Sequence, residues 1–245
     1  DYKVLVKSLY ANAQSVQVYG GEDAATPDYG KVYISIKAKS GSNLTEVTKV
    51  SLVQSLKSFA VASVTPVIID PETTFIILET TFKYDSSATT KDISTLQTNV
   101  INAISSYNTD TLENFTGVFR YSTVGKTIDD ADTSILSNIT KVKMYKHITP
   151  TLNSGLKYTL SFNNALYNPH SGHNATGGGI VSSTGFKIND DSSTNEHFLD
   201  DDGAGNIRVY YLSGTTRIYT NSIFGTVDYT TGEIILTSAN ITSIS

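Results

Sequence analysis

The sequence predicts an α+β fold, in which an antiparallel sheet carries helices on one face and is followed by a β-rich module. Short alternating segments rich in Val, Ile, Thr and Tyr, the residues that favour strands, occur along the whole chain. Two segments of the first half instead repeat apolar residues at helical spacing. After Pro150, connections rich in Gly, Asn and Ser separate short alternating strands. We therefore expect two domains, an α+β domain at residues 1–137 and a β-rich domain at residues 138–245.

The first part of the chain predicts one helix followed by two strand–strand–helix units. A short amphipathic helix is expected at residues 2–10, and alternating strands are expected at residues 15–19 and 31–37. Residues 43–46 have the form of a capping box, in which Asn43 accepts an unpaired backbone N–H of the helix that follows. We expect the apolar residues of this helix to form one buried stripe, consisting of Val47, Val50, Val53, Leu56 and Phe59.

The second strand–strand–helix unit begins with strands at residues 64–69 and 74–82, which a turn at residues 70–73 joins as a hairpin. Its helix, at residues 91–107, is the best helical pattern of the chain. The expected cap is Thr89 or Thr90, and the expected apolar stripe is Ile93, Leu96, Val100, Ile101 and Ile104. Short connections and one apolar face on each helix place the helices on one side of the sheet.

The β-rich part follows a mixed segment at residues 111–137, which predicts a short helix or a turn. Residues 138–148 alternate strongly and predict a strand. Further strands are expected at residues 156–162, 179–188, 206–212, 215–220, 226–229 and 233–237. The connection at residues 163–179 is too long for a hairpin, so we expect it to be mobile or bound to a neighbouring protein.

Composition and charge limit the classes of function. The formal net charge is −5 and no basic patch is present, which disfavours a nucleic-acid partner and an anionic membrane surface. The sequence has no apolar run of about eighteen residues and no visible signal peptide. Because Cys is absent, disulfides, thiolate metal sites and thiol catalysis are excluded. The single methionine is Met144, so we expect the chain to be part of a longer protein.

Two motifs could bind a metal ion, and each has a simpler interpretation. His170 and His173 stand three residues apart in a loop and could bind a metal together with a carboxylate. No third ligand is close in sequence, so a polar surface loop is favoured. The aspartates at residues 200–202, followed by Gly203, supply the oxygen ligands that calcium prefers. An EF-hand would need a glutamate where Tyr211 stands, so an ordinary turn is favoured here as well.

Other candidate chemistry is weaker. The glycine pair at residues 20–21, beside Glu22 and Asp23, could hold a metal or a phosphate, but we interpret it as a sharp turn with positive φ. The acidic cluster at residues 190–196 is interpreted as a solvated rim, or as a surface that faces a basic partner. The sequence contains no nucleophile elbow and no phosphate-binding glycine loop. We therefore expect no catalytic residue, no cofactor and no metal site.

Five segments follow one another along residues 1–169: VQVYGGEDAATPDYGKVYISIK, LTEVTKVSLVQSLKSF, VTPVIIDPETTFIILETTFKYD, FRYSTVGKTIDDADTSILSNITKVKMYK and ITPTLNSGLKYTLSFNNALYNP. In these segments and their order, the chain resembles the baseplate wedge proteins of T-even-type contractile-tailed phages, within the baseplate J-like family. Ala38 departs from the family, which has a proline after the strand. The family's chains are also much longer, so this chain corresponds to their C-terminal portion.

The resemblance implies a structural protein of the virion tail baseplate, assembled in the host cytoplasm and without enzymatic activity. It implies a ring around the hub, built by self-association as a dimer or ring and by contacts with other wedge proteins, that rearranges on sheath contraction. From composition, the expected interface residues are the loop 163–180 and Tyr210, Tyr211 and Tyr219, because Tyr gives a large contact area at low entropy cost. One alternative is a β-rich surface module that binds carbohydrate or a receptor through residues 163–206. Another is a metal-dependent enzyme built on His170 and His173.

Overall fold

The computed structural model describes residues 1–24, 27–41, 43–59, 64–173, 179–191 and 194–244. The chain forms two compact units, Asp1–Thr73 with Ile77–Lys143 and Thr74–Ile76 with Met144–Ser245. The predicted α+β fold with a β-rich part is confirmed. A membrane crossing would need a longer and more apolar helix than any found in the described ranges.

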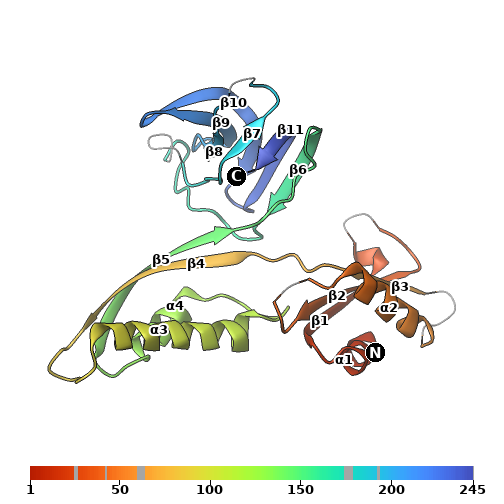
Figure 1. Ribbon diagram of the computed structural model, residues 1–245, viewed down its shortest axis with the longest axis horizontal. Coiled ribbons are helices and arrows are strands. Elements are labelled where there is room, and N and C mark those ends of the chain that lie inside the picture. The colour runs from red at the N-terminus through yellow and green to blue at the C-terminus, as the bar shows by residue number, and fades with distance from the viewer. Residues whose placement is uncertain (25–26, 42, 60–63, 174–178, 192–193, 245) are drawn as a thin grey trace. The chain divides into compact units, whose positions relative to one another are not determined.

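The first unit begins with a three-stranded sheet and two helices (Figure 1). Its elements are α1 (Tyr2–Leu9), β1 (Ala13–Gly20), the 3₁₀ turn η1 (Gly21–Asp23), β2 (Lys31–Ala38), α2 (Glu46–Lys57) and β3 (Thr65–Ile69). β1 pairs antiparallel with β2, and β2 pairs parallel with β3. The helices bury Val6 and Leu56 against Ile34 and Ile36 of β2, and each of these side chains is at most 1% exposed. The strands of this sheet are thus held together by one small apolar core.

The start and the buried face of α2 both differ from the prediction. Thr45, not Asn43, caps the helix, and its Oγ1 accepts a hydrogen bond from the Thr48 backbone N–H at 3.3 Å. The expected stripe is right at Leu56, which is fully buried, but wrong at Val47, which is 80% exposed. A helix turns about 100° per residue, so apolar residues spaced three apart move about 60° round the axis at each step. Residues nine apart therefore lie on opposite faces, and Leu52 joins Leu56 in the core instead.

The hairpin expected between residues 64–69 and 74–82 is also wrong. In the chain, α2 lies between β2 and β3, and a helical crossover of this kind is what allows two strands of one sheet to run parallel. The next strand, β4 (Phe75–Tyr84), belongs to a different, two-stranded sheet, in which it pairs with β5 (Ile135–Tyr145). Residues 70–73 therefore connect two sheets.

The β4–β5 sheet carries helices on one face, and we call it the ribbon. Figure 1 shows α3 (Ile93–Tyr107) and α4 (Tyr121–Asp129) along the same side of the ribbon, joined through the π-helical turn η2 (Asn108–Leu112). The short helix expected within residues 111–137 is therefore confirmed as α4. The core between ribbon and helices consists of Val100, Val124, Ile128 and Ile135, packed against Leu78, Phe82, Ile104, Tyr107, Phe119 and Ala131.

The cap of α3 is Asp92 and not one of the two threonines. Its carboxylate accepts from the Thr95 backbone N–H at 2.8 Å, whereas Thr89 Oγ1 accepts from the Lys91 N–H in the turn before the helix. A carboxylate at this end also interacts favourably with the helix dipole, which a hydroxyl does not. Of the expected stripe, Ile101 is 61% exposed and lies outside the core.

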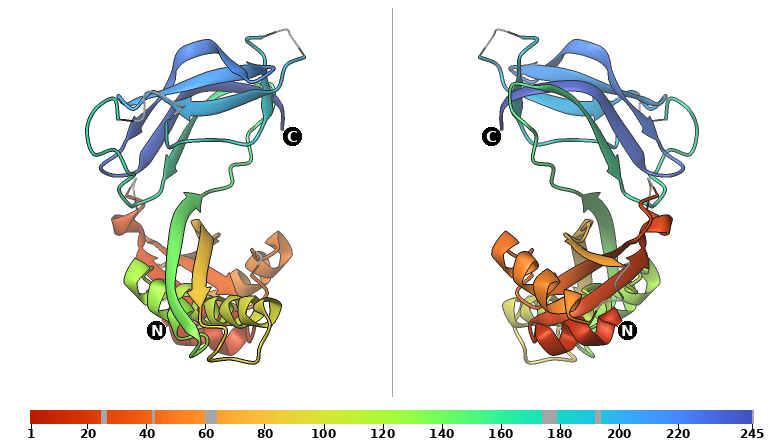
Figure 2. Two further views of the ribbon diagram at one scale, coloured as in Figure 1. Left: turned by 90° about the vertical axis from the view of Figure 1, so that its left-hand side faces the viewer. Right: turned by 90° about the vertical axis from the view of Figure 1, so that its right-hand side faces the viewer.

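The second unit is an antiparallel sheet of six strands, with the order β10-β9-β8-β7-β11-β6. β10 also pairs with β11, which closes the sheet on itself (Figure 2). The strands are β6 (Gly155–Ser161), β7 (Phe186–Ile188), β8 (His197–Asp201), β9 (Asn206–Ser213), β10 (Thr216–Asp228) and β11 (Glu233–Ile244). Its core consists of Phe186, Ile188, Ile207, Val209, Phe224, Val227, Ile234, Leu236, Ala239 and Ile241.

Three strands of the second unit differ from the prediction. β7 is shorter than residues 179–188, and the strands expected at residues 215–220 and 226–229 form the single long strand β10. β8 was not predicted, because its end was interpreted as a turn. That error matters, since β8 carries the two most deeply buried carboxylates of the unit.

Candidate protein-interaction site

The outer face of β8, β9 and β10 carries a cluster of arginine, tyrosine and apolar side chains, which we call the Arg–Tyr patch. It consists of Phe198, Asp200, Arg208, Tyr210, Leu212, Arg217 and Tyr219. Strand register brings these residues together, because Asp200 lies opposite Arg208, and Tyr210 lies opposite Tyr219. Since successive side chains of a strand point to opposite faces, Ile207 and Val209 enter the core while the patch residues face away from it.

Asp200 organises the patch. This carboxylate is 1% exposed and accepts three hydrogen bonds, from Arg208 Nε at 2.9 Å, from Arg217 Nη1 at 2.7 Å and from the Tyr219 hydroxyl at 2.8 Å. A buried carboxylate is tolerated only when it is paired and hydrogen-bonded in this way. Burial, and next the hydrogen bond to Asp200, raise the pKa of Tyr219. Two arginines around one aspartate leave the patch with one excess positive charge.

Aromatic contacts hold both arginines in place. The Arg208 guanidinium lies over the Tyr219 ring at 4.3 Å, and the Arg217 guanidinium lies over the Tyr210 ring at 4.6 Å. The Tyr210 ring lies 5.8 Å from that of Tyr219 and stacks on Phe198 at 5.7 Å, measured between ring centroids. These side chains therefore reach the surface already ordered, which lowers the entropy lost when a partner binds.

The accessible part of the patch combines apolar, aromatic and cationic groups. The Leu212 residue is 49% exposed, the Tyr219 residue 39%, and the Arg217 side chain 34%. Tyr and Arg are the residues that most often dominate the binding energy of protein interfaces. The arrangement is therefore suited to docking another protein.

The structure separates the three tyrosines that composition singled out. Tyr210 and Tyr219 belong to the Arg–Tyr patch, although Tyr210 is only 8% exposed and mainly supports the arginine above it. Tyr211 faces the other way, with its ring 6.0 Å from that of His197. A contact role for these residues stays a prediction.

Sequence reasoning missed Asp200, Arg208 and Arg217 as parts of this site. One signal could have found the arginines, because the triplet Arg-x-Tyr occurs in both alternating segments, at residues 208–210 and 217–219. In a strand, residues two apart share a face. Each triplet therefore places a cation beside a ring.

The aspartates at residues 200–202 are hydrogen-bond acceptors with separate sets of donors. Asp201 is fully buried and accepts from the Ile180 and Val181 backbone N–H groups, both at 2.7 Å, and from the Tyr229 hydroxyl. Burial, and next this hydrogen bond, raise the pKa of Tyr229. Asp202 accepts from the backbone N–H groups of Ala204 and Asn206. Asp200 and Asp201 end β8 on opposite faces, so the expected turn begins only at Asp202, where it joins β8 to β9. The oxygens of the three aspartates therefore do not converge on one cation.

The loop at residues 163–180 is described only in part, because residues 174–178 lie outside the described residues. Its first half is tied to its own unit, since the Gly172 backbone N–H and Asn168 Nδ2 donate to the Gly203 carbonyl at 2.8 and 3.1 Å. His170 Nε2 lies 3.1 Å from His173 Nδ1, and both residues are exposed. Within the described ranges, no group of three His, Asp or Glu residues is placed to hold a metal ion.

The glycine pair at residues 20–21 is needed for lack of room at the turn, and not for a positive φ angle. Gly20 has φ −70°, and Gly21 is not among the glycines with positive φ, so that part of the prediction is wrong. A Cβ on Gly21 would lie 1.9 Å from the Asp28 carbonyl oxygen, and the Asp28 N–H donates back to the Gly21 carbonyl at 2.9 Å. Only glycine allows this close approach of two backbone segments.

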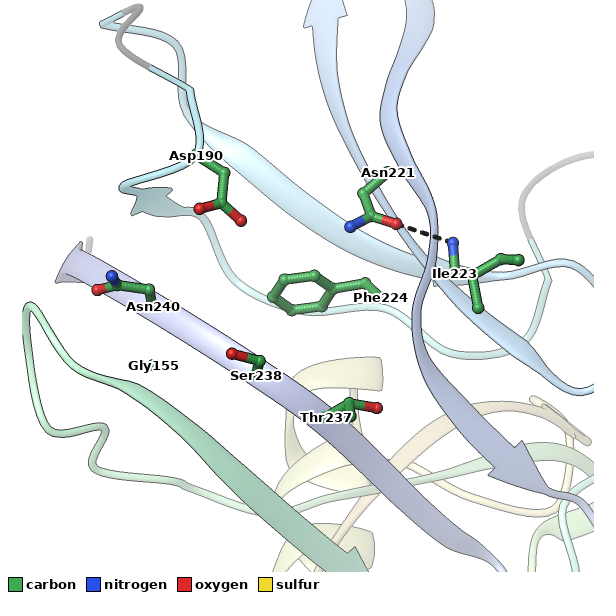
Figure 3. A pocket seen from close by; sticks show the side chains of 8 residues that line it. All are labelled: Gly155, Asp190, Asn221, Ile223, Phe224, Thr237, Ser238 and Asn240. Carbon is green, nitrogen blue, oxygen red and sulfur yellow. Dashed lines mark hydrogen bonds between the residues drawn. The ribbon is translucent and has the colours of Figure 1, made fainter.

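A small pocket of about 270 Å³ lies where the edge of β11 changes partner from β10 to β7 (Figure 3). It is lined by Gly155, Asp190, Asn221, Ile223, Phe224, Thr237, Ser238 and Asn240. Asn221 Oδ1 is already engaged, because it accepts from the Ile223 backbone N–H at 2.9 Å. The Phe224 residue is 5% exposed, so its ring offers little face on which a sugar could stack. The pocket therefore gives little support to carbohydrate binding.

The matches to known proteins are to baseplate proteins of one type. Residues 1–69 match the family model described as baseplate structural protein gp6, C-terminal domain I, and residues 72–147 match that of C-terminal domain III. The chain is also similar to baseplate wedge protein gp6 of Enterobacteria phage T4, with 28% identity over 190 residues. This match covers 70% of the chain and 28% of the relative, so the chain spans less than a third of that protein's length.

Proposed function

Since the chain belongs to the gp6-type baseplate wedge proteins, we propose that it works as a structural component of a phage tail baseplate wedge. In this role it joins its own copies and other wedge proteins into the ring around the hub, and the ring rearranges when the sheath contracts. Its place is the virion tail baseplate, which is assembled in the host cytoplasm. The observation that carries the proposal is the succession of two gp6 C-terminal domains, I and then III, along residues 1–147.

The Arg–Tyr patch supports a role in assembly. Its arginines are held by Asp200 and by aromatic rings, so a partner meets a rigid surface. The patch has one excess positive charge, whereas the chain has a formal net charge of −5. An acidic surface of a second copy is therefore electrostatically complementary to it. We propose that copies of the chain meet through this patch.

Light scattering over a concentration series tests the self-contact. The mass should rise above the 26.5 kDa of one chain as the concentration increases. Leu212→Glu should hold the chain at the mass of one copy, because it removes apolar contact area and adds a carboxylate that neutralises the patch. Leu212 is 49% exposed and outside the apolar core, so the variant should still fold.

Ile223→Glu is the matched control, since Ile223 is also an aliphatic residue of the same closed sheet and is 73% exposed, but lies outside the patch. It should associate like the parent chain. A mass of one copy at every concentration, or equal effects of the two substitutions, contradicts self-association through the Arg–Tyr patch.

A further inference from the structure

The ribbon has a second face that the helices do not cover. Thr80 and Thr140 share a side-chain hydrogen bond of 3.1 Å on one face, and Lys143 pairs with Glu79 on the other. Leu78 lies on the same face as Thr80 and packs against the core beneath α3 and α4. The odd-numbered residues of β4, and those of β5 from Ile139 onward, therefore share the opposite side, which we call the ribbon face. Ile135, at the start of β5, belongs to the core instead. Within the first unit it consists of Ile77, Glu79, Thr81, Lys83, Ile139, Lys141 and Lys143.

The ribbon face exposes aliphatic side chains. Ile139 is 71% exposed and Ile77 is 45% exposed, and the burial of β4 alternates strictly between exposed and half-buried along its ten residues. Most sheets have about four to six strands, and a two-stranded sheet is marginally stable by itself. Here α3 and α4 stabilise one face, and the apolar groups on the other remain without a covering layer among the described residues of this unit. The two exposed isoleucines give a partner apolar area to cover on this face.

Charge decides what kind of partner fits. The ribbon face holds three lysines and one glutamate, a net charge of 3 − 1 = +2, on a chain whose formal net charge is −5. The hydrogen bond from Lys143, and next its charge, lower the pKa of Glu79, so this acid is ionised and neutralises Lys143. The excess positive charge therefore belongs to Lys83 and Lys141. Two copies meeting face to face would bring the same lysines together, which is unfavourable.

We propose that the ribbon face is a docking surface for an acidic segment of another baseplate protein, whose carboxylates meet Lys83 and Lys141 while its apolar residues cover Ile77 and Ile139. In an extended segment only every second residue meets the ribbon face, so a segment fits when its facing residues, two apart in sequence, alternate between apolar and acidic. The inference rests on the proposed role in an assembly, but the contact is separate from the Arg–Tyr patch.

The test uses the full chain with ¹³C-labelled isoleucine methyl groups, observed by NMR. The probe is the acetylated eight-residue peptide Val-Ser-Glu-Ser-Val-Ser-Glu-Ser, whose valines and glutamates share one face when it is extended, and the matched probe has lysine in place of each glutamate. The acidic peptide should shift the methyl signals of Ile77 and Ile139, and the basic peptide should not.

A charge reversal sharpens the test. The double variant Lys83→Glu/Lys141→Glu changes the net charge of the ribbon face from +2 to −2 and keeps the pair between Lys143 and Glu79. It should bind the acidic peptide at least about tenfold more weakly and should bind the basic one instead. The control Lys3→Glu/Lys57→Glu reverses two exposed lysines on α1 and α2 and should behave like the parent chain.

Three outcomes of the binding measurements overturn the inference. They are the absence of shifts at Ile77 and Ile139, equal binding of both peptides, and binding that the reversal does not change. Ile139 methyl signals that a soluble paramagnetic probe cannot reach in the free chain also overturn it, because the chain itself would then cover the ribbon face. Peptide binding needs no self-association, so a chain that stays at the mass of one copy and still binds the acidic peptide refutes only the proposed self-contact.

Discussion

Asp200→Asn tests whether one buried carboxylate holds the Arg–Tyr patch together. The substitution keeps the size of the side chain and removes its charge. Asp200 accepts three hydrogen bonds from Arg208, Arg217 and Tyr219, two of them from cations. An asparagine has a single acceptor oxygen, so it can keep only part of this set and turns an N–H₂ group toward the remaining donors.

The cost follows from these contacts. A hydrogen bond to a charged group contributes roughly 1.5–3 kcal/mol, and breaking a buried ion pair from one side costs about 3–5 kcal/mol. The Arg217 side chain is 34% exposed and can turn to water, whereas the Arg208 side chain is 16% exposed and cannot do so as easily. We therefore expect the lower end of this range, a loss of about 3 kcal/mol in the free energy of unfolding of the second unit.

Urea unfolding followed by far-UV circular dichroism measures this loss, and the tyrosine fluorescence of the chain, which has no Trp, gives a second signal. Asp190→Asn is the control, because Asp190 is exposed and the same change there should alter stability by less than about 0.5 kcal/mol. A loss below about 1 kcal/mol for Asp200→Asn refutes the idea that this carboxylate organises the patch.

Two further predictions concern the first unit. Leu56→Ala should lower the free energy of unfolding by about 3 kcal/mol, whereas Val47→Ala, at a position 80% exposed, should cost less than about 0.5 kcal/mol; similar costs in urea unfolding would contradict the observed rotation of α2. The pKa of Asp132 is lowered, chiefly by the hydrogen bond from Lys91 and next by one from the Ser134 backbone N–H. A lowered folded-state pKa contributes stability that is present above the unfolded pKa, about 4, and is lost as the pH falls below it. Asp132→Asn should therefore flatten the decline of the urea midpoint between about pH 5 and pH 3, and a decline as steep as that of the parent chain would show that Asp132 does not cause it.

Local patterns predicted the strands of the first unit well and their pairing less well. β1 and β2 alternate between apolar and polar residues, a signal that depends on each strand alone. β3 pairs with β2 because the connection through α2 brings the chain back beside β2 in the parallel direction. A turn at residues 70–73 is compatible both with a hairpin and with a connection to another sheet. Pairing is non-local, so the sequence of the turn could not decide between them.

Buried charge explains why the sequence does not predict the strand β8. The segment of β8 ends in two aspartates, residues that are depleted in strands and frequent in turns. They are stable there because donors come from later parts of the chain. Asp200 accepts from Arg208 of β9 and Arg217 of β10, 8 and 17 residues on, and Asp201 accepts from Tyr229 in the turn after β10, 28 residues on. Tyr210 and Tyr219 could be named from composition, but their union with the arginines depends on the register of β9 and β10.

The most direct test of the account is a cryo-electron microscopy reconstruction of the tail baseplate of the virion that carries this chain. The account predicts that the chain lies in the ring around the hub, with the Arg–Tyr patch buried against another protein chain before or after sheath contraction. A reconstruction in which the outer face of β8, β9 and β10 meets solvent in both states would contradict it.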